Sequence, residues 1–277
     1  MSKTKLPGLN YQKFKSTKET IQLYAQLLSS IKGQFTPHQK NWEEFSLKIY
    51  AKGFTTTPIP VETQNGIEAL DLNLNFVEHK LKIFYNGKRE SVDLVQPNVK
   101  SFTEKLLSKL GLFNIKPDVD EKFLSEEPLS YNIDEVEKIW NAIRQIYFVL
   151  LEFKGKQLLE TSNINFWAHH FDLAMLMFTG RLLPGQDPEN WDYSREQINS
   201  GFSLGDEGIT EPYFYITAYP FPKDAATETL PEYMFWQTEG WNGAVMKYVE
   251  LLNGNDSKQK LTEFLEKISG ILLSKMV

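Results

Sequence analysis

The amino-terminal half of the chain shows two different hydrophobic periods. Between residues 16 and 33 apolar side chains recur every three to four positions, which predicts an amphipathic helix with a capping box at its start. Within residues 42–53 and 69–95 apolar and polar residues alternate, as in β-strands with one covered face, and Asn86-Gly87 predicts a hairpin turn. A second capped helix is predicted at residues 101–111. This half therefore reads as a helix, an antiparallel meander and a helix.

The carboxy-terminal half repeats this order. A capped helix with one apolar stripe is predicted at residues 132–155. Three strand-like runs follow, at residues 165–178, 213–219 and 233–236. Two further helices are predicted at residues 243–252 and 257–273. The segment 180–208 is rich in Gly, Pro, Asp, Asn and Ser and is predicted to be a long loop, beneath which a functional site is expected.

Strands follow one another directly, without the intervening helices that parallel βαβ units require. The predicted fold class is therefore α+β, with antiparallel sheet meanders flanked by helices. The order indicates two similar helix–strands–helix halves packed as one compact unit, at residues 1–130 and 131–277, of which the second carries the candidate site. An internal duplication would explain why each half has a strand that begins near a tryptophan and ends in glycine.

Charge and composition narrow the classes of function. The formal net charge is −6, with the acidic excess in residues 155–277, and no cluster of Lys and Arg could follow a phosphate backbone, so no nucleic acid partner is expected. The absence of cysteine excludes disulfides, thiolate nucleophiles and cysteine-bound metals. No run of 18 apolar residues predicts a membrane span, and no apolar segment follows the first six residues as in a secretory signal. We therefore expect a cytoplasmic protein with no membrane partner.

Few motifs of known chemistry are present. Neither a phosphate-binding glycine loop nor a G-x-S-x-G motif occurs, so no nucleotide site and no serine acyl transfer are predicted. The run His170-Phe171-Asp172 has the H-x-D form of an iron site, but no later histidine completes it. The alternating oxygen ligands of residues 71–75 lack the glycine of a calcium loop, and we interpret them as the solvated face of a strand. No metal site and no cofactor are therefore predicted.

Candidate site residues cluster in the carboxy-terminal half. In a strand at residues 165–178, His170 and Asp172 would share one face and serve as a base and its orienting group, with Glu196 as a further catalytic candidate. In the strand at 213–219 the hydroxyl-bearing residues share one face. The ligand-binding candidates are Trp167, Arg181, Tyr213, Tyr215 and Tyr219. Purely structural roles explain the same pattern. His170 and Asp172 would then be hydrogen-bonded polar residues at a strand end, and the tyrosines would be half-buried residues of a sheet.

Particular runs of residues carry a resemblance to a known family. They are Trp42 with residues 53–60 and 76–81, the run from 178 to 181, Ser200-Gly201-Phe202, residues 213–220, and above all residues 165–174, which read NFWAHHFDLA. Together, over residues 10–250, they resemble a bacterial family of uncharacterised proteins catalogued as domain of unknown function 5996. The resemblance implies no activity. The resemblance assigns no catalytic role to His169 or His170, because the family has small or serine residues at these two positions.

The sequence leaves two functions open. An aromatic wall beside acidic residues suits a polyol, a sugar or an organic cation, which favours a small-molecule binding protein or an enzyme of undefined reaction. The alternative is a non-catalytic protein–protein interaction or homodimerising protein, whose aromatic residues form a contact surface. A concave pocket with converging polar groups would favour the first function, and a flat surface the second.

Overall fold

The computed structural model describes residues 6–253 and 256–276, which fold as two compact units. The amino-terminal unit comprises Gln12–Trp140 and Asn165–Phe171, and the carboxy-terminal unit comprises the described parts of Met1–Tyr11, Asn141–Ile164 and Asp172–Val277. Residues 1–5, where the sequence shows no apolar signal segment, lie outside the described residues. The division at residue 130 stays a prediction.

The amino-terminal unit is an antiparallel sheet with helices. Its sheet runs in the order β8-β1-β2-β4-β5-β6, and β3 pairs with β4. The strands are β1 (Ser46–Tyr50), β2 (Gly53–Thr55), β3 (Ile59–Thr63), β4 (Gly66–Asn75), β5 (Lys80–Tyr85), β6 (Lys88–Asp93) and β8 (Asn165–Trp167). The helices are α1 (Tyr11–Phe35), η1 (Lys40–Phe45), α2 (Val99–Gly111), η2 (Glu121–Leu124) and the start of α3 (Ile133–Gly155).

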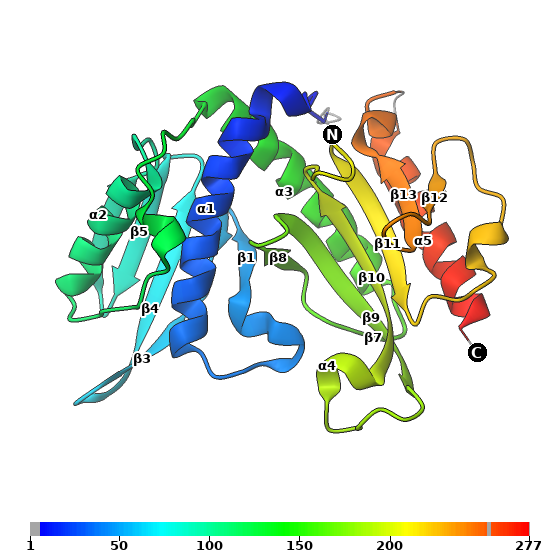
Figure 1. The fold of residues 1–277 in the computed structure, drawn as a ribbon, viewed down its shortest axis with the longest axis horizontal. Helices are drawn as coiled ribbons and strands as arrows, with labels where there is room; N and C mark the ends of the chain where they lie inside the picture. Colours follow the sequence, from blue (N-terminus) through cyan, green and yellow to red (C-terminus); the bar gives the residue numbers. More distant parts are fainter. Residues whose placement is uncertain (1–5, 254–255, 277) are drawn as a thin grey trace. The chain divides into compact units, whose positions relative to one another are not determined.

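Strand alternation gives this sheet one apolar and one polar face. Along β4, Leu70, Leu72 and Leu74 are buried without exposed area, and the residues between them carry carboxylate or amide groups. The helices form a layer on the apolar side, where Tyr24 of α1 stacks on Phe102 of α2 with ring centroids 3.9 Å apart (Figure 1). The opposite face of the sheet is therefore the one on which polar groups gather.

The carboxy-terminal unit has a second antiparallel arrangement, in the order β12-β13-β11-β10-β9 with β7 paired to β9. Its strands are β7 (Glu160–Thr161), β9 (Asp172–Leu182), β10 (Arg195–Ser203), β11 (Tyr213–Tyr219), β12 (Phe235–Gln237) and β13 (Gly243–Lys247). Its helices are the rest of α3, α4 (Trp191–Ser194), η3 (Ala225–Thr227), η4 (Tyr248–Leu251) and α5 (Ser257–Lys275). Because α5 packs against β10 and β11, their apolar face, with Phe202, Phe214 and Ile216, is buried (Figure 1).

The α+β class predicted from the sequence is confirmed, and so are the Asn86-Gly87 hairpin, the helix at 132–155 and the strand at 213–219. The first helix begins at Tyr11, so the predicted capping box near residue 16 lies inside it. No helix in the part of the chain that the structure describes has an apolar stretch long enough to cross a membrane.

Three local predictions in the carboxy-terminal half are wrong. Residues 243–252 form β13 and the short η4 rather than one helix, because β13 pairs with strands on both sides. The predicted loop at 180–208 contains β10, in which buried residues occupy both faces near its end, so its alternation is weak. The predicted strand at 165–178 is broken at residues 168–171, where the Phe171 amide donates to the Trp167 carbonyl at 2.7 Å and Phe171 has a φ of 57°.

Candidate functional site

Tyr215 and Asp172, both predicted site residues, are joined by a hydrogen bond in the carboxy-terminal unit. The Tyr215 hydroxyl donates to Oδ2 of Asp172, although β10 lies between their strands. Gly201 of β10 stands directly opposite Tyr215, and a Cβ atom there would be 2.5 Å from both Cζ and the hydroxyl oxygen of Tyr215. The tyrosine ring therefore crosses β10 over the bare backbone of Gly201.

This pair is held in a tyrosine-rich network. Burial raises the pKa of Tyr215 well above its usual value, and the charge of Asp172 raises it further. Tyr213 donates to Oδ2 of Asp206 at 2.5 Å, and burial raises its pKa as well. Both phenols are neutral donors at physiological pH and both already donate within the protein. Tyr219, at the end of β11, is exposed.

Arg181 and Glu196 form a second, separate cluster. Arg181 Nη2 lies 2.5 Å from Oε2 of the buried Glu196 and 2.6 Å from the Met276 carbonyl oxygen, and the Thr179 hydroxyl donates to the same Glu196 oxygen at 2.5 Å. Arg181 and Asp172 stand near opposite ends of β9, about 30 Å apart at the usual rise per strand residue. These predicted residues therefore do not converge on one site.

Trp167 and His170 belong to the amino-terminal unit. Trp167 ends β8 opposite Ser46, and His170 is exposed in the turn that follows, with its ring 4.2 Å from that of His169. The prediction that His170 shares a strand face with Asp172 is wrong, because the turn separates them along the chain. A catalytic role for either residue stays a prediction.

The sequence did not indicate the open groove on the polar face of the amino-terminal sheet. Its volume is about 750 Å³. It is lined by Tyr50, Lys52, Asp71, Asn73, Asn75, Glu78, Lys82, Phe84, Arg89, Glu90 and Ser91. All of these residues lie on β1, β4, β5, β6 or the turns beside them, so one rigid sheet positions the whole set.

At one end of the groove, two lysines share one carboxylate. Glu78 accepts from Lys52 at 2.6 Å, Lys82 at 2.7 Å and the Asn75 amide at 3.0 Å. These hydrogen bonds lower the pKa of Glu78 to about 2, and the bond from Lys52 has the largest effect. The side-chain oxygen Oδ1 of Asn75 in turn accepts from the backbone amides of Val77 and Glu78. This end is a fixed scaffold whose polar groups already have partners.

Two buried polar groups in the groove differ from that scaffold. Asn73 is only 6% exposed, and its side-chain amide makes no hydrogen bond to any described residue. The Tyr50 hydroxyl is also buried and has no partner within the described chain. Burial raises its pKa, and the charges of Glu78 and Asp71 raise it further, so the phenol is neutral. Buried polar groups normally find partners, so these two are exceptions among the groups that line the groove.

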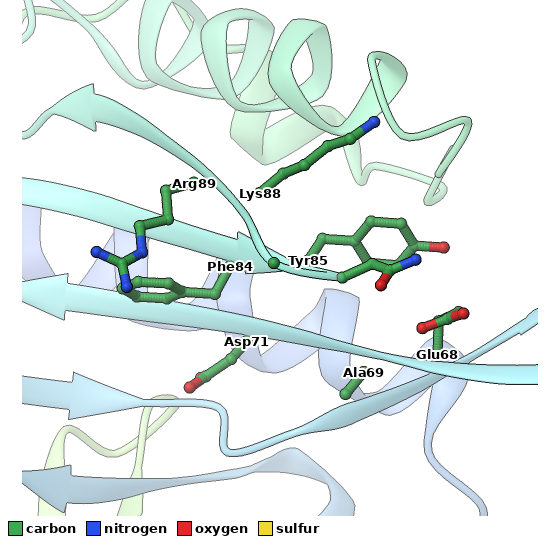
Figure 2. Close-up of a pocket in the computed structure, with 9 residues that line it drawn as sticks. Glu68, Ala69, Asp71, Phe84, Tyr85, Lys88 and Arg89 are labelled. Atoms are coloured by element: carbon green, nitrogen blue, oxygen red, sulfur yellow. The ribbon is translucent and has the colours of Figure 1, made fainter.

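A charged row crosses three strands at the other end of the groove. Asp71 of β4 stands opposite Phe84 of β5, which stands opposite Arg89 of β6. Figure 2 shows the Arg89 side chain bent over the Phe84 ring, and the guanidinium carbon lies 5.8 Å from the ring centroid. Oδ1 of Asp71 accepts from the Thr55 hydroxyl at 2.8 Å. A second depression, of about 400 Å³, shares these three residues with the groove (Figure 2).

The strand predicted at residues 69–76, with its polar side chains on one face, is confirmed as β4. The interpretation of that face as solvated is wrong for Asn73 and Asn75, which are 6% and 2% exposed. The signal in the sequence was the presence of asparagine inside a strand, where it is disfavoured unless it has a special role.

Within residues 6–253 and 256–276, no group of three or more His, Asp or Glu side chains is placed to hold a metal ion. No curated protein and no solved structure shows significant similarity to the chain. The model of a family of unknown function, DUF5996, matches residues 6–269, so the chain belongs to this family.

Proposed function

We propose that this protein binds a small polar organic molecule, of the polyol, sugar or charged-amine kind, in the groove of its amino-terminal unit. One observation carries the proposal: Asn73 and Tyr50 line a groove large enough for such a molecule, and neither the buried Tyr50 hydroxyl nor the Asn73 side-chain amide makes a hydrogen bond within the described chain. An unsatisfied buried group costs about 1–3 kcal/mol, and a bound hydroxyl, carbonyl or ammonium group would recover that cost.

The groove supports this function better than the tyrosine face of the carboxy-terminal unit. There, the hydroxyls of Tyr215 and Tyr213 already donate to Asp172 and Asp206, and Arg181 is engaged by Glu196. A ligand would have to break those bonds before it formed its own. In the groove, the Tyr50 hydroxyl and the Asn73 side-chain amide make no hydrogen bond within the described chain, so a ligand would not have to displace a partner from them.

Thermal unfolding against a panel of sugars, polyols, amines, amino acids and carboxylates tests the proposal. A ligand at 100 times its dissociation constant stabilises the native state by about 2.7 kcal/mol, which raises Tm by about 5–10 °C in a protein of this size. We expect at least one class to produce such a shift, and Asn73→Leu and Tyr50→Phe to abolish or sharply reduce it.

Tyr215→Phe is the matched control, because it removes one buried phenolic hydroxyl from the other unit and should leave the shift unchanged. A shift lost only in Tyr215→Phe would move the site to the carboxy-terminal unit. No shift with any compound, together with a dimer in light scattering, would instead support the alternative function as a homodimerising interaction protein.

A further inference from the structure

The charged residues of the groove fall into paired and unpaired sets. Glu78 is paired with Lys52 and Lys82, and Glu90 is paired with Lys109 of α2 at 2.8 Å. Asp71 and Arg89 form no ion pair with any residue that the structure describes. Asp71 and Arg89 are thus one negative and one positive group of the groove that have no ion-pair partner within the described chain.

Their spacing is set by the sheet. Asp71 and Arg89 stand two strands apart in register, so their backbones are about 10 Å apart, and both side chains project from the same face. Phe84 lies between them and is 36% exposed. Side chains that project from such positions on one face can both reach a small molecule between them, each through a charge-assisted hydrogen bond of about 2.8 Å. An apolar part of the same molecule would rest on the exposed part of the Phe84 ring, beside the guanidinium.

This inference rests on the proposed function and specifies its ligand: we propose that the groove binds a small zwitterion, such as a free amino acid, with its ammonium group on Asp71 and its carboxylate on Arg89. The planar guanidinium suits bidentate carboxylate binding. The side-chain oxygen of Asn73 lies on the same face of β4 as Asp71 and accepts from the ammonium group, which has three donors to place. The neutral Tyr50 hydroxyl supplies a further hydrogen bond inside the groove.

Other ligand classes match these groups less well. A simple amine would leave Arg89 uncompensated, and a simple carboxylate would do the same to Asp71. A neutral sugar would partly desolvate both charges and return no opposite charge to either, which is unfavourable. Only a molecule with both charges compensates both residues at once.

Isothermal titration calorimetry at pH 7 with matched probes tests the inference. Phenylalanine is compared with phenethylamine, which lacks the carboxylate, and with 3-phenylpropionate, which lacks the ammonium group; leucine, glutamine, glycerol and glucose complete the set. We expect an amino acid to bind, and removal of either charged group to weaken binding about tenfold or more, as expected for a lost hydrogen bond to a charged group.

The variants locate the two charges. Asp71→Asn and Arg89→Gln should each weaken binding of the amino acid about tenfold or more. Lys88→Gln is the control, since it removes a positive charge from the neighbouring position of β6, where the lysine lies 5.9 Å from the Phe113 ring. It should leave binding unchanged. Circular dichroism and Tm of the free variants establish that each one is folded.

The outcomes separate this inference from the proposed function. Binding of glucose or glycerol without binding of any amino acid would overturn the zwitterion assignment and leave the groove as a ligand site. Equal affinity of the amino acid for the wild type, Asp71→Asn and Arg89→Gln would also overturn it. Failure of every compound in this set and in the broader panel would overturn both.

Discussion

Replacing Gly201 by alanine should destabilise the protein, although alanine normally strengthens a strand. Gly201 has no left-handed backbone angle, so alanine would fit the strand conformation and would gain about 0.4–1 kcal/mol by restricting the unfolded chain. Its methyl group would nevertheless lie 2.5 Å from the Tyr215 ring and hydroxyl. The ring must then swing away from Asp172.

The cost of that movement outweighs the gain. Loss of the hydrogen bond from Tyr215 to the carboxylate costs about 1.5–3 kcal/mol, and overpacking of a buried site costs about 1–3 kcal/mol. After subtraction of the gain, we expect the free energy of unfolding to fall by about 2–5 kcal/mol, with Tm lower by about 5–15 °C.

Urea denaturation of a double-mutant cycle measures this effect. In a Tyr215→Ala background the ring is absent, so Gly201→Ala should cost little or become stabilising, which gives a coupling of about 2 kcal/mol or more between the two positions. A Gly201→Ala protein as stable as the wild type, or an equal cost in both backgrounds, would refute the proposed crossing of Tyr215 over β10.

Two further predictions concern the groove without ligand. Asn73→Leu should raise the free energy of unfolding by about 1 kcal/mol, at the expense of ligand binding, because it replaces an almost fully buried amide that makes no hydrogen bond by an apolar side chain; a loss of stability in urea denaturation would contradict this. The pKa of Glu78 is lowered to about 2, so its contribution to stability is present above the unfolded pKa near 4.3 and is lost as pH falls towards 2. Wild type should therefore have a higher Tm than Glu78→Gln at pH 6, with the difference vanishing near pH 2; a difference that does not change with pH would count against the ion-pair assignment.

Regular elements with a clear period could be predicted from the sequence, and elements without one could not. The helix α3 and the β5–β6 hairpin were predicted because a long apolar stripe and an Asn-Gly turn are local signals, and Asn86 and Gly87 do adopt positive φ values. The strands β10 and β13 were missed because each one pairs with a neighbouring strand on both edges. This pairing, rather than an alternation of apolar and polar residues, determines their conformation. The turn at Phe171 depends on one positive φ angle that no local motif indicated.

The candidate sites show the same division. Parity along β11 correctly placed Tyr213 and Tyr215 on one face, but their link to Asp172 depends on the bare backbone of Gly201 one strand away. The groove depends on register between β4, β5 and β6, which brings Asp71, Phe84 and Arg89 into one row. No spacing along the chain shows that row, because it is formed across strands.

A crystal structure of the protein with the best ligand of the panel would test the central claim most directly. We predict that the ligand lies in the groove, with polar atoms within hydrogen-bond distance of the Asn73 amide and the Tyr50 hydroxyl, about 2.7–3.2 Å. A ligand found at the tyrosine face of the carboxy-terminal unit, or a groove that stays unoccupied while the ligand binds elsewhere, would contradict the account.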